Sequence, residues 1–324
     1  MRIVVLGGAG FIGKKLVEKL LERGQISLNG RPIELFEQLV VFDKHSATGL
    51  PDDSRLEIIE GDICDQKIIA DLIGDHTDLL FHLAAIVSGE AEKNFDLGMM
   101  VNLQASMQIL EHCRYMKRAP VLVFASSCAA YSLELTNVIR DDTAPSPQSS
   151  YGTQKVMVDL LINDYSRRGC IDGRALRLPT IAVRPGKPNA ATTSFVSSII
   201  REPLQGKRAN CPVPPEIKLW IHSPEKVVEN FIHAAHVPAQ AFKNNRIVNL
   251  PGMTVTVKEM VDTLEAIAGK ETTELIDWEP DAFIQSIVLT IPREFETPKA
   301  LALGFQGDDS LKAIIESFIR EELA

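Results

Sequence analysis

Short apolar segments alternate with longer amphipathic ones along most of this chain of 324 residues. The apolar segments are rich in Val, Ile and Leu, as is typical of strands that are buried on both faces of a sheet. Ile12, Leu16 and Leu20 recur every fourth residue up to Gly24, which predicts the first helix. The predicted strands are residues 2–6, 39–42, 56–59, 79–83, 121–125, 174–178 and 246–250. This alternation predicts an α/β fold with a doubly wound parallel sheet.

Proline-rich stretches at 179–188 and 203–215 interrupt the alternation and indicate a boundary between two lobes. We expect a larger domain made of residues 1–183 and about 217–250. The smaller lobe would comprise about 184–216 and 251–324, with helices near 257–268 and 309–323. It would lie over the carboxyl ends of the strands, where α/β proteins hold their ligands.

Composition narrows the class of protein. Hydrophobic residues make up 45% and charged residues 24%, as in an ordinary globular protein. The net charge is −9 and no run of Lys or Arg is dense, so nucleic acid is not an expected partner. Five scattered cysteines without a C-x-x-C pair predict neither a disulfide framework nor a metal site. The first strand leaves no room for a signal peptide, and no apolar run approaches the ~20 residues of a membrane helix. We therefore expect a cytoplasmic protein that does not enter a membrane.

A glycine-rich motif, G-x-x-G-x-x-G, lies between the first predicted strand and the first helix. Glycine lets the backbone turn sharply and approach a pyrophosphate closely, and the helix N-terminus adds N–H groups for the anion. A tight turn without a ligand is the alternative, but the strand–turn–helix setting favours a dinucleotide site. The fold is then of the Rossmann type, with the cofactor held by Gly7, Gly10, Phe11, Ile12 and Gly13.

The second predicted strand is followed by Asp43. A carboxylate there accepts hydrogen bonds from the adenosine ribose and repels a 2′-phosphate, which favours NAD over NADP. The distance from the glycines exceeds the ~20 residues that are usual, and we attribute the excess to an inserted loop at about 24–32. Lys44 and His45 could weaken the preference for NAD, and a simple turn role for Asp43 stays open.

Further cofactor contacts are expected after the third and fourth strands. Asp62 and Ile63 follow the third strand, where a carboxylate can meet the adenine amino group. Leu83, Ala84 and Ala85 follow the fourth, where small side chains let the cofactor lie against the backbone. Each signal is weak alone, because Gly-Asp turns and Ala-Ala pairs are common.

Tyr151 and Lys155 are one turn apart on a predicted helix and so share a face. Tyrosine has a pKa of ~10, so it acts as a base at neutral pH only where a positive charge favours its phenolate. Lys155 and an oxidised nicotinamide would provide that charge. Ser127, with Ser126 as the next choice, ends the fifth strand and would orient the substrate oxygen for hydride transfer. A solvated helix face is the alternative for the Tyr–Lys pair alone.

The segments GGAGFIG, FHLAA, ASS, YGTQK and LRLPTIAVRPGKPN together resemble the extended short-chain dehydrogenases/reductases over nearly the whole chain. The resemblance implies that Tyr151 is the general base or acid, that Lys155 binds the nicotinamide ribose and that Ser127 polarises the reacting oxygen. It also implies cofactor contacts at Asn102, Ser126, Leu178, Pro179 and Thr180.

Residues 176–206 more narrowly resemble a branch of this family that uses NAD to oxidise the C2 hydroxyl of D-erythronate, a four-carbon sugar acid, to 2-oxo-tetronate. Arg184, Lys187 and Asn189 lie in a proline-stiffened loop that suits a small carboxylate flanked by hydroxyls. Ser88 is a weaker candidate for substrate contact. The alternative for the two cations is that they are solvated or paired with acidic residues.

Two other functions stay open. A nucleotide-sugar epimerase or dehydratase of the same superfamily would share the cofactor and the Tyr–Lys chemistry. A non-catalytic regulator that senses NAD would bind the cofactor without turnover. The family resemblance also implies a homodimer, formed through helices near 92–116 and 151–167, whose broad apolar faces are visible in the sequence.

Overall fold

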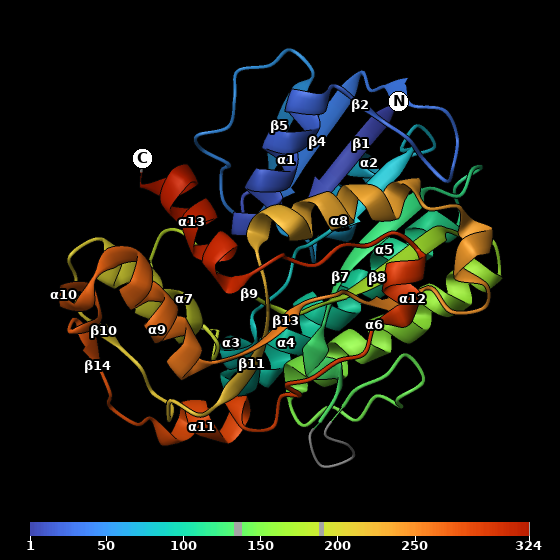
Figure 1. Ribbon diagram of the computed structural model, residues 1–324. Helices are drawn as coiled ribbons and strands as arrows, with labels where there is room; N and C mark the ends of the chain where they lie inside the picture. The colour runs from blue at the N-terminus through green and yellow to red at the C-terminus, as the bar shows by residue number, and fades with distance from the viewer. Residues whose placement is uncertain (133–137, 188–190, 324) are drawn as a thin grey trace.

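The computed structural model describes residues 1–132, 138–187 and 191–323 (Figure 1). Within these ranges a seven-stranded sheet forms the centre, with the order β12-β8-β7-β6-β1-β4-β5. Every pairing in it is parallel. The strands are β1 (Arg2–Leu6), β4 (Gln38–Asp43), β5 (Leu56–Glu60), β6 (Leu79–His82), β7 (Val121–Ser127), β8 (Asp172–Leu178) and β12 (Ile247–Asn249). All seven predicted strands and the doubly wound α/β fold are confirmed.

Alternate side chains of β1 pack into the two apolar cores on opposite faces of the sheet. Ile3 and Val5 pack on one face of the sheet, and Val4 and Leu6 pack on the other. Helices α1 (Phe11–Arg23) and α8 (Pro224–His236) cover the first face; α2 (Gln66–Leu72), α5 (Ala105–Arg114) and α6 (Ser150–Arg167) cover the second. Burial on both faces explains why these strands are apolar throughout, which is the signal that the sequence carries.

The strand order reverses at β1. Strands β4 and β5 lie on one side of it, and β6, β7, β8 and β12 lie on the other. Connections therefore leave the carboxyl ends of β1 and β6 in opposite directions, and a crevice opens between them. Short elements follow β6 and β7 at this edge: α3 (Ser88–Lys93), α4 (Phe95–Gly98), the π-helix η1 (Met99–Gln104) and the 3-10 helix η2 (Cys128–Ala130).

The smaller lobe has its own sheet, in the order β13-β11-β9, and its own apolar core (Figure 1). Its strands and helices are β9 (Thr180–Ile181), α7 (Phe195–Leu204), β10 (Ala209–Asn210), β11 (Lys218–His222), β13 (Met253–Thr256), α9 (Val257–Ala268), α10 (Lys270–Thr273), β14 (Ile276–Asp277), α11 (Ala282–Val288) and α13 (Leu311–Glu322). A 3-10 helix, η3 (Ala239–Phe242), follows α8 in the larger domain, and α12 (Pro298–Ala302) returns the chain to that domain, where Ala300 is buried. Within the described residues, every helix is too short or too polar to cross a bilayer.

The packing differs in detail from the division expected between the lobes. Residues 217–222 were expected in the larger domain, but β11 pairs with β9 and β13, and Leu219 and Ile221 pack in the smaller core. Conversely, Ala300 and Phe305 pack into the larger core. An apolar strand has the same sequence pattern whichever sheet it joins, because its partners are distant in sequence.

Candidate active site

A cavity of about 360 Å³ lies at the carboxyl ends of β1, β6, β7 and β8, next to the smaller lobe. Many of the residues predicted from the sequence line it. They are Gly7, Gly10, Phe11, Ile12, Gly13, Leu83, Ser88, Ser126, Ser127, Tyr151, Leu178, Pro179, Thr180 and Arg184. The cavity thus brings together the glycine-rich loop, the serine strand, the tyrosine helix and the loop that enters the smaller lobe.

The glycine-rich loop is built for close contact. Gly7 has φ +84°, and a Cβ there would lie 2.5 Å from the backbone nitrogen of Ala84. Only glycine fits this approach between the ends of β1 and β6. Gly10 caps α1 with no side-chain hydrogen bond, so no side chain satisfies the first N–H groups of that helix. Phe11, Ile12 and Gly13, the first residues of this helix, line the cavity, so the helix N-terminus suits an anionic group there.

The carboxylate of Asp43 lies against this loop. The Ala9 N–H donates to Asp43 Oδ2 at 3.0 Å. The expected insertion before it is a short hairpin of β2 (Gln25–Ile26) and β3 (Glu34–Leu35). Lys44 pairs with Asp62 at 3.5 Å, so part of its charge is already offset. The backbone N–H of Cys64 is the main cause that lowers the pKa of Asp62.

Four of the expected cofactor residues lie behind the cavity or support its wall. Ile63 is buried in the core under α2 and α5. Ala84 lies under Gly7, and Ala85 follows it. The Asn102 side chain accepts from the Ile86 N–H at 2.8 Å and donates to Ile86 O at 3.1 Å, so it holds the loop after β6.

Tyr151 lies in the first turn of α6, opposite the end of β7. The Ser149 hydroxyl caps α6 by accepting from the Gly152 N–H at 3.1 Å. A Cβ at Gly152 would lie 2.1 Å from Ala129 O, so glycine allows α6 to approach η2 closely. Burial raises the pKa of Tyr151, and hydrogen bonding to Ser127 opposes that effect. Tyrosine and serine hydroxyls therefore meet in the cavity.

Lys155 is buried behind Tyr151, with 1% of its surface exposed. Its Nζ donates to Ala125 O at 2.8 Å and lies 5.6 Å from the centroid of the Tyr151 ring. Burial lowers the pKa of Lys155 to about 8, and Asp159 opposes the change. The cation is thus fixed between β7 and the tyrosine.

A buried polar network lies beside Lys155, and the sequence analysis did not identify it. Asp159 is 0% exposed and accepts from Arg177 Nε at 2.8 Å. Arg177 also donates to the Tyr131 hydroxyl, which donates to Asn249 Oδ1 at 3.0 Å. Burial raises the pKa of Asp159, and Arg177 opposes this. Two signals were available: Asp159 is one helical turn after Lys155, and Arg177 interrupts an apolar strand.

Of the residues expected to bind the substrate, some line the cavity and others do not. Arg184 lines the cavity, and the Ser88 hydroxyl lies 3.3 Å from that of Thr192. Lys187 is exposed and is not among the described residues that line the cavity. Asn189 lies outside the described residues. Sequence reasoning did not single out the other lining residues, which include Val87, Cys128, Ile181, Thr193 and Ile291.

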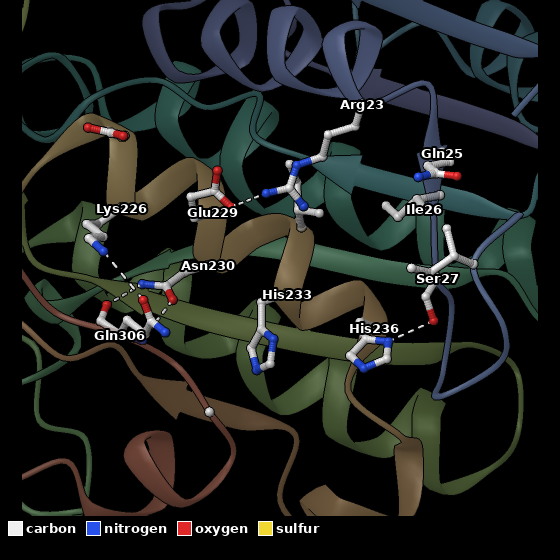
Figure 2. Close-up of a pocket in the computed structure, with 14 residues that line it drawn as sticks. Arg23, Gln25, Ile26, Ser27, Lys226, Glu229, Asn230, His233, His236 and Gln306 are labelled. Atoms are coloured by element: carbon white, nitrogen blue, oxygen red, sulfur yellow. Dashed lines mark hydrogen bonds and ion pairs between the residues drawn. The ribbon is translucent and has the colours of Figure 1, made fainter. Parts of the chain in front are cut away.

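A roomier pocket, of about 720 Å³, lies along the outer face of α8 beside β2 (Figure 2). Several of its polar side chains already pair with one another. Arg23 pairs with Glu229, and the His236 ring bonds the Ser27 hydroxyl at 2.7 Å. None of the predicted site residues lines it. The smaller cavity, where the hydroxyls and the glycine loop meet, is the candidate active site.

Comparison with known proteins agrees with this geometry. Residues 3–237 match the model of the NAD dependent epimerase/dehydratase family. The chain belongs to this family. The extended short-chain dehydrogenase/reductase resemblance is therefore confirmed. Curated relatives of this chain include D-erythronate dehydrogenase of Cupriavidus necator, 46% identical over 99% of this chain and 98% of that protein. D-erythronate dehydrogenase of Haemophilus influenzae is 43% identical, with both chains covered fully.

Solved structures include proteins with the same fold. A protein from Agrobacterium tumefaciens, described as a nucleoside-diphosphate-sugar epimerase, has a TM-score of 0.92 at 37% identity. The match covers 100% of this chain and 94% of that one. L-Threonine dehydrogenase from Phytophthora infestans has a TM-score of 0.85 at 24% identity, over 99% and 98% of the two chains. The latter likeness supports the fold alone.

Proposed function

We propose that this protein is an NAD-dependent dehydrogenase that oxidises the C2 hydroxyl of D-erythronate. The observation that carries the proposal is the single cavity where the glycine-rich loop meets the hydroxyls of Ser127 and Tyr151. The full-length identity of 46% and 43% to two D-erythronate dehydrogenases supports the substrate. A cytoplasmic location and a homodimer stay predictions from the sequence.

The residues present fit a nicotinamide dinucleotide. A side chain at Gly7 would collide with Ala84, and the uncapped N-terminus of α1 suits a pyrophosphate. Asp43, held against the loop, would bind the adenosine ribose and disfavour the 2′-phosphate of NADP. Bound NAD would supply the hydride acceptor. Lys155 would hold the nicotinamide ribose, and Pro179 and Thr180 would line the carboxamide end.

Tyr151 is the proposed proton acceptor. Its phenolate would take the proton of the substrate hydroxyl and become the neutral phenol, while Ser127 holds the same substrate oxygen by a hydrogen bond. Burial raises the pKa of Tyr151 and so disfavours the phenolate. Lys155 lies 5.6 Å from the ring centroid, and a cation so close favours the phenolate. The buried carboxylate of Asp159 in turn favours the charged form of Lys155.

The substrate would bind at the end of the cavity formed by the hydroxyls. The carboxyl carbon of a 2-hydroxy acid is bonded to the carbon that reacts, so the carboxylate must lie beside Ser127 and Tyr151. Ser88 and Thr193 line the same cavity and would bind the acid or its remaining hydroxyls. Lys187 and Asn189 remain predicted contacts.

The test is NADH formation by the purified protein with NAD and a panel of four-carbon sugar acids. We expect turnover with D-erythronate. The Tyr151→Phe variant should lose about 10²- to 10⁴-fold in kcat, the usual contribution of a general base. No turnover with any acid would contradict the proposal.

A nucleotide-sugar epimerase stays the second candidate, because the similar Agrobacterium tumefaciens protein carries that description. Thermal shift with UDP-glucose and with D-erythronate, each in the presence of NADH, separates the two functions. Stabilisation by the sugar nucleotide but not by the acid would favour the epimerase.

A further inference from the structure

Arg184 has an unusual place for a cation. It follows β9 and lines the cavity, with its Cζ 5.8 Å from the centroid of the Phe11 ring. Phe11 is the first residue of α1, directly after the glycine cap. The Arg184 Nε is buried without a hydrogen-bond partner. Among the described residues, no carboxylate forms an ion pair with this guanidinium. The side chain is positioned as if for a ligand that comes from outside the protein.

Helix α7 fixes the backbone of Arg184 on both sides. The Arg184 N–H donates to Ser197 Oγ at 3.0 Å, and its carbonyl oxygen accepts from Arg201 Nη1 at 2.5 Å. Arg201 is itself 2% exposed and pairs with Glu202 at 2.6 Å. Such anchoring reduces the entropy that a binding side chain loses when its ligand arrives.

The local charges do not balance. Arg201 pairs with the carboxylate of Glu202, whereas the nearby guanidinium of Arg184 forms no ion pair with a described carboxylate. Burial, together with the charge of Arg201, lowers the pKa of Arg184. Half-buried cations are normally paired, so the protein alone leaves one positive charge that an anion would neutralise. An arginine fork suits an oxyanion with two acceptor oxygens, such as a carboxylate or a phosphate.

Two anions could come to this cavity: the sugar-acid carboxylate and the dinucleotide pyrophosphate. The carboxylate must lie beside the reacting carbon, and therefore against Ser127 and Tyr151. The recorded ring contact of Arg184 is instead with Phe11, at the helix N-terminus where a pyrophosphate would bind. We propose that Arg184 is a ligand of the cofactor pyrophosphate, supplied by the smaller lobe, rather than of the substrate carboxylate. This inference rests on the proposed NAD site.

The test is calorimetric titration of the purified full-length chain with ADP-ribose, which contains the pyrophosphate but neither nicotinamide nor substrate. Arg184→Met keeps an unbranched apolar chain against Phe11 and removes the charge. We expect it to weaken ADP-ribose binding by about 10- to 100-fold, as for the loss of a hydrogen bond to a charged group. Arg184→Lys should restore part of the affinity, whereas a folding defect would not respond to the charge. Arg208→Met, an exposed arginine that pairs with Asp277, is the matched control and should bind normally.

The second measurement is the KM for D-erythronate at saturating NAD. We expect it to stay within about twofold in Arg184→Met, since a pyrophosphate ligand acts on the cofactor. Unchanged ADP-ribose binding with a raised KM would overturn the inference and assign Arg184 to the carboxylate. Unchanged values of both would also overturn it. Failure of the unmodified protein to bind ADP-ribose would instead refute the NAD site, and the inference with it.

Discussion

Replacing the buried carboxylate of Asp159 tests whether the network behind the active site maintains the charge of Lys155. The substitution Asp159→Asn preserves shape and one acceptor oxygen for Arg177 but removes the negative charge. We expect a less stable protein whose activity declines at a lower pH than that of the unmodified enzyme. The two effects have one origin, because Asp159 is the anion between two buried cations.

The size of the expected loss of stability follows from the burial of the three charged groups. Asp159, Lys155 and Arg177 are 0%, 1% and 5% exposed, so water cannot screen the charges that the substitution leaves unpaired. Removing one partner of a buried ion pair usually costs about 3–5 kcal/mol. Natural domains have free energies of unfolding of about 5–15 kcal/mol, so the variant should still fold. The pKa of Lys155 is already lowered to about 8, and loss of the group that raises it should lower it further.

Urea denaturation measures the first effect and the pH profile of kcat/KM for NAD measures the second. Asp164→Asn is the matched control: this residue lies on the same helix but is half-exposed and pairs with Arg167 at the surface. The control should change the free energy of unfolding by less than about 0.5 kcal/mol. A similarly small change in Asp159→Asn, or a pH profile identical to that of the unmodified protein, would refute the reasoning.

Three further results are expected. Because the pKa of Lys155 is about 8, its proton is lost as the pH rises through that value. The affinity for NAD, measured by calorimetry, should therefore fall above pH 8. A constant affinity from pH 7 to 9 would count against a role for the charge of Lys155. Asp43→Ser should raise the ratio of kcat/KM for NADP to kcat/KM for NAD at least about tenfold, because it removes the repulsion between the carboxylate and the 2′-phosphate of NADP. An unchanged ratio would mean that Asp43 does not face the ribose. Gly152→Ala should lower the free energy of unfolding, measured in urea, by about 1–3 kcal/mol, because the added Cβ would lie 2.1 Å from Ala129 O. An equally stable variant would show that α6 can move away from η2.

The sequence predicted the strands of the central sheet well because they are buried on both faces. Strand β1 was predicted with its observed bounds, and β4 and β5 within a residue at each end. The positions of Tyr151 and Lys155 on one helix also followed from spacing alone. In each case the signal is local: apolar runs, glycine turns and helical periodicity are all read within about 20 residues.

Contacts between distant segments could not be predicted in this way. Strand β11 pairs with β9 and β13, which are distant in sequence, so the pairing depends on the three-dimensional path of the chain. Strand β9 has only two residues, too few for a recognisable apolar pattern. The placement of Arg184 against Phe11 joins residues far apart in sequence, and spacing gave only a cation in a proline-rich loop. The Asp159–Arg177 pair likewise forms between a helix and a strand. The sequence shows that Arg177 interrupts an apolar strand, but it does not show which carboxylate pairs with that arginine.

The loop after β9 has a consequence for enzyme engineering. Arg184, beside Phe11 of the glycine-rich motif, and Thr193 both belong to the segment between β9 and α7, and both line the cavity. If Arg184 binds the cofactor pyrophosphate as proposed, a library that exchanges residues 182–193 to obtain a new substrate preference would also change the Michaelis constant for the cofactor. Variants selected for a new acid would then be discarded for poor cofactor use. Libraries that vary Ser88, Thr193 and Ile291 while keeping Arg184 and its support in α7 would separate the two properties.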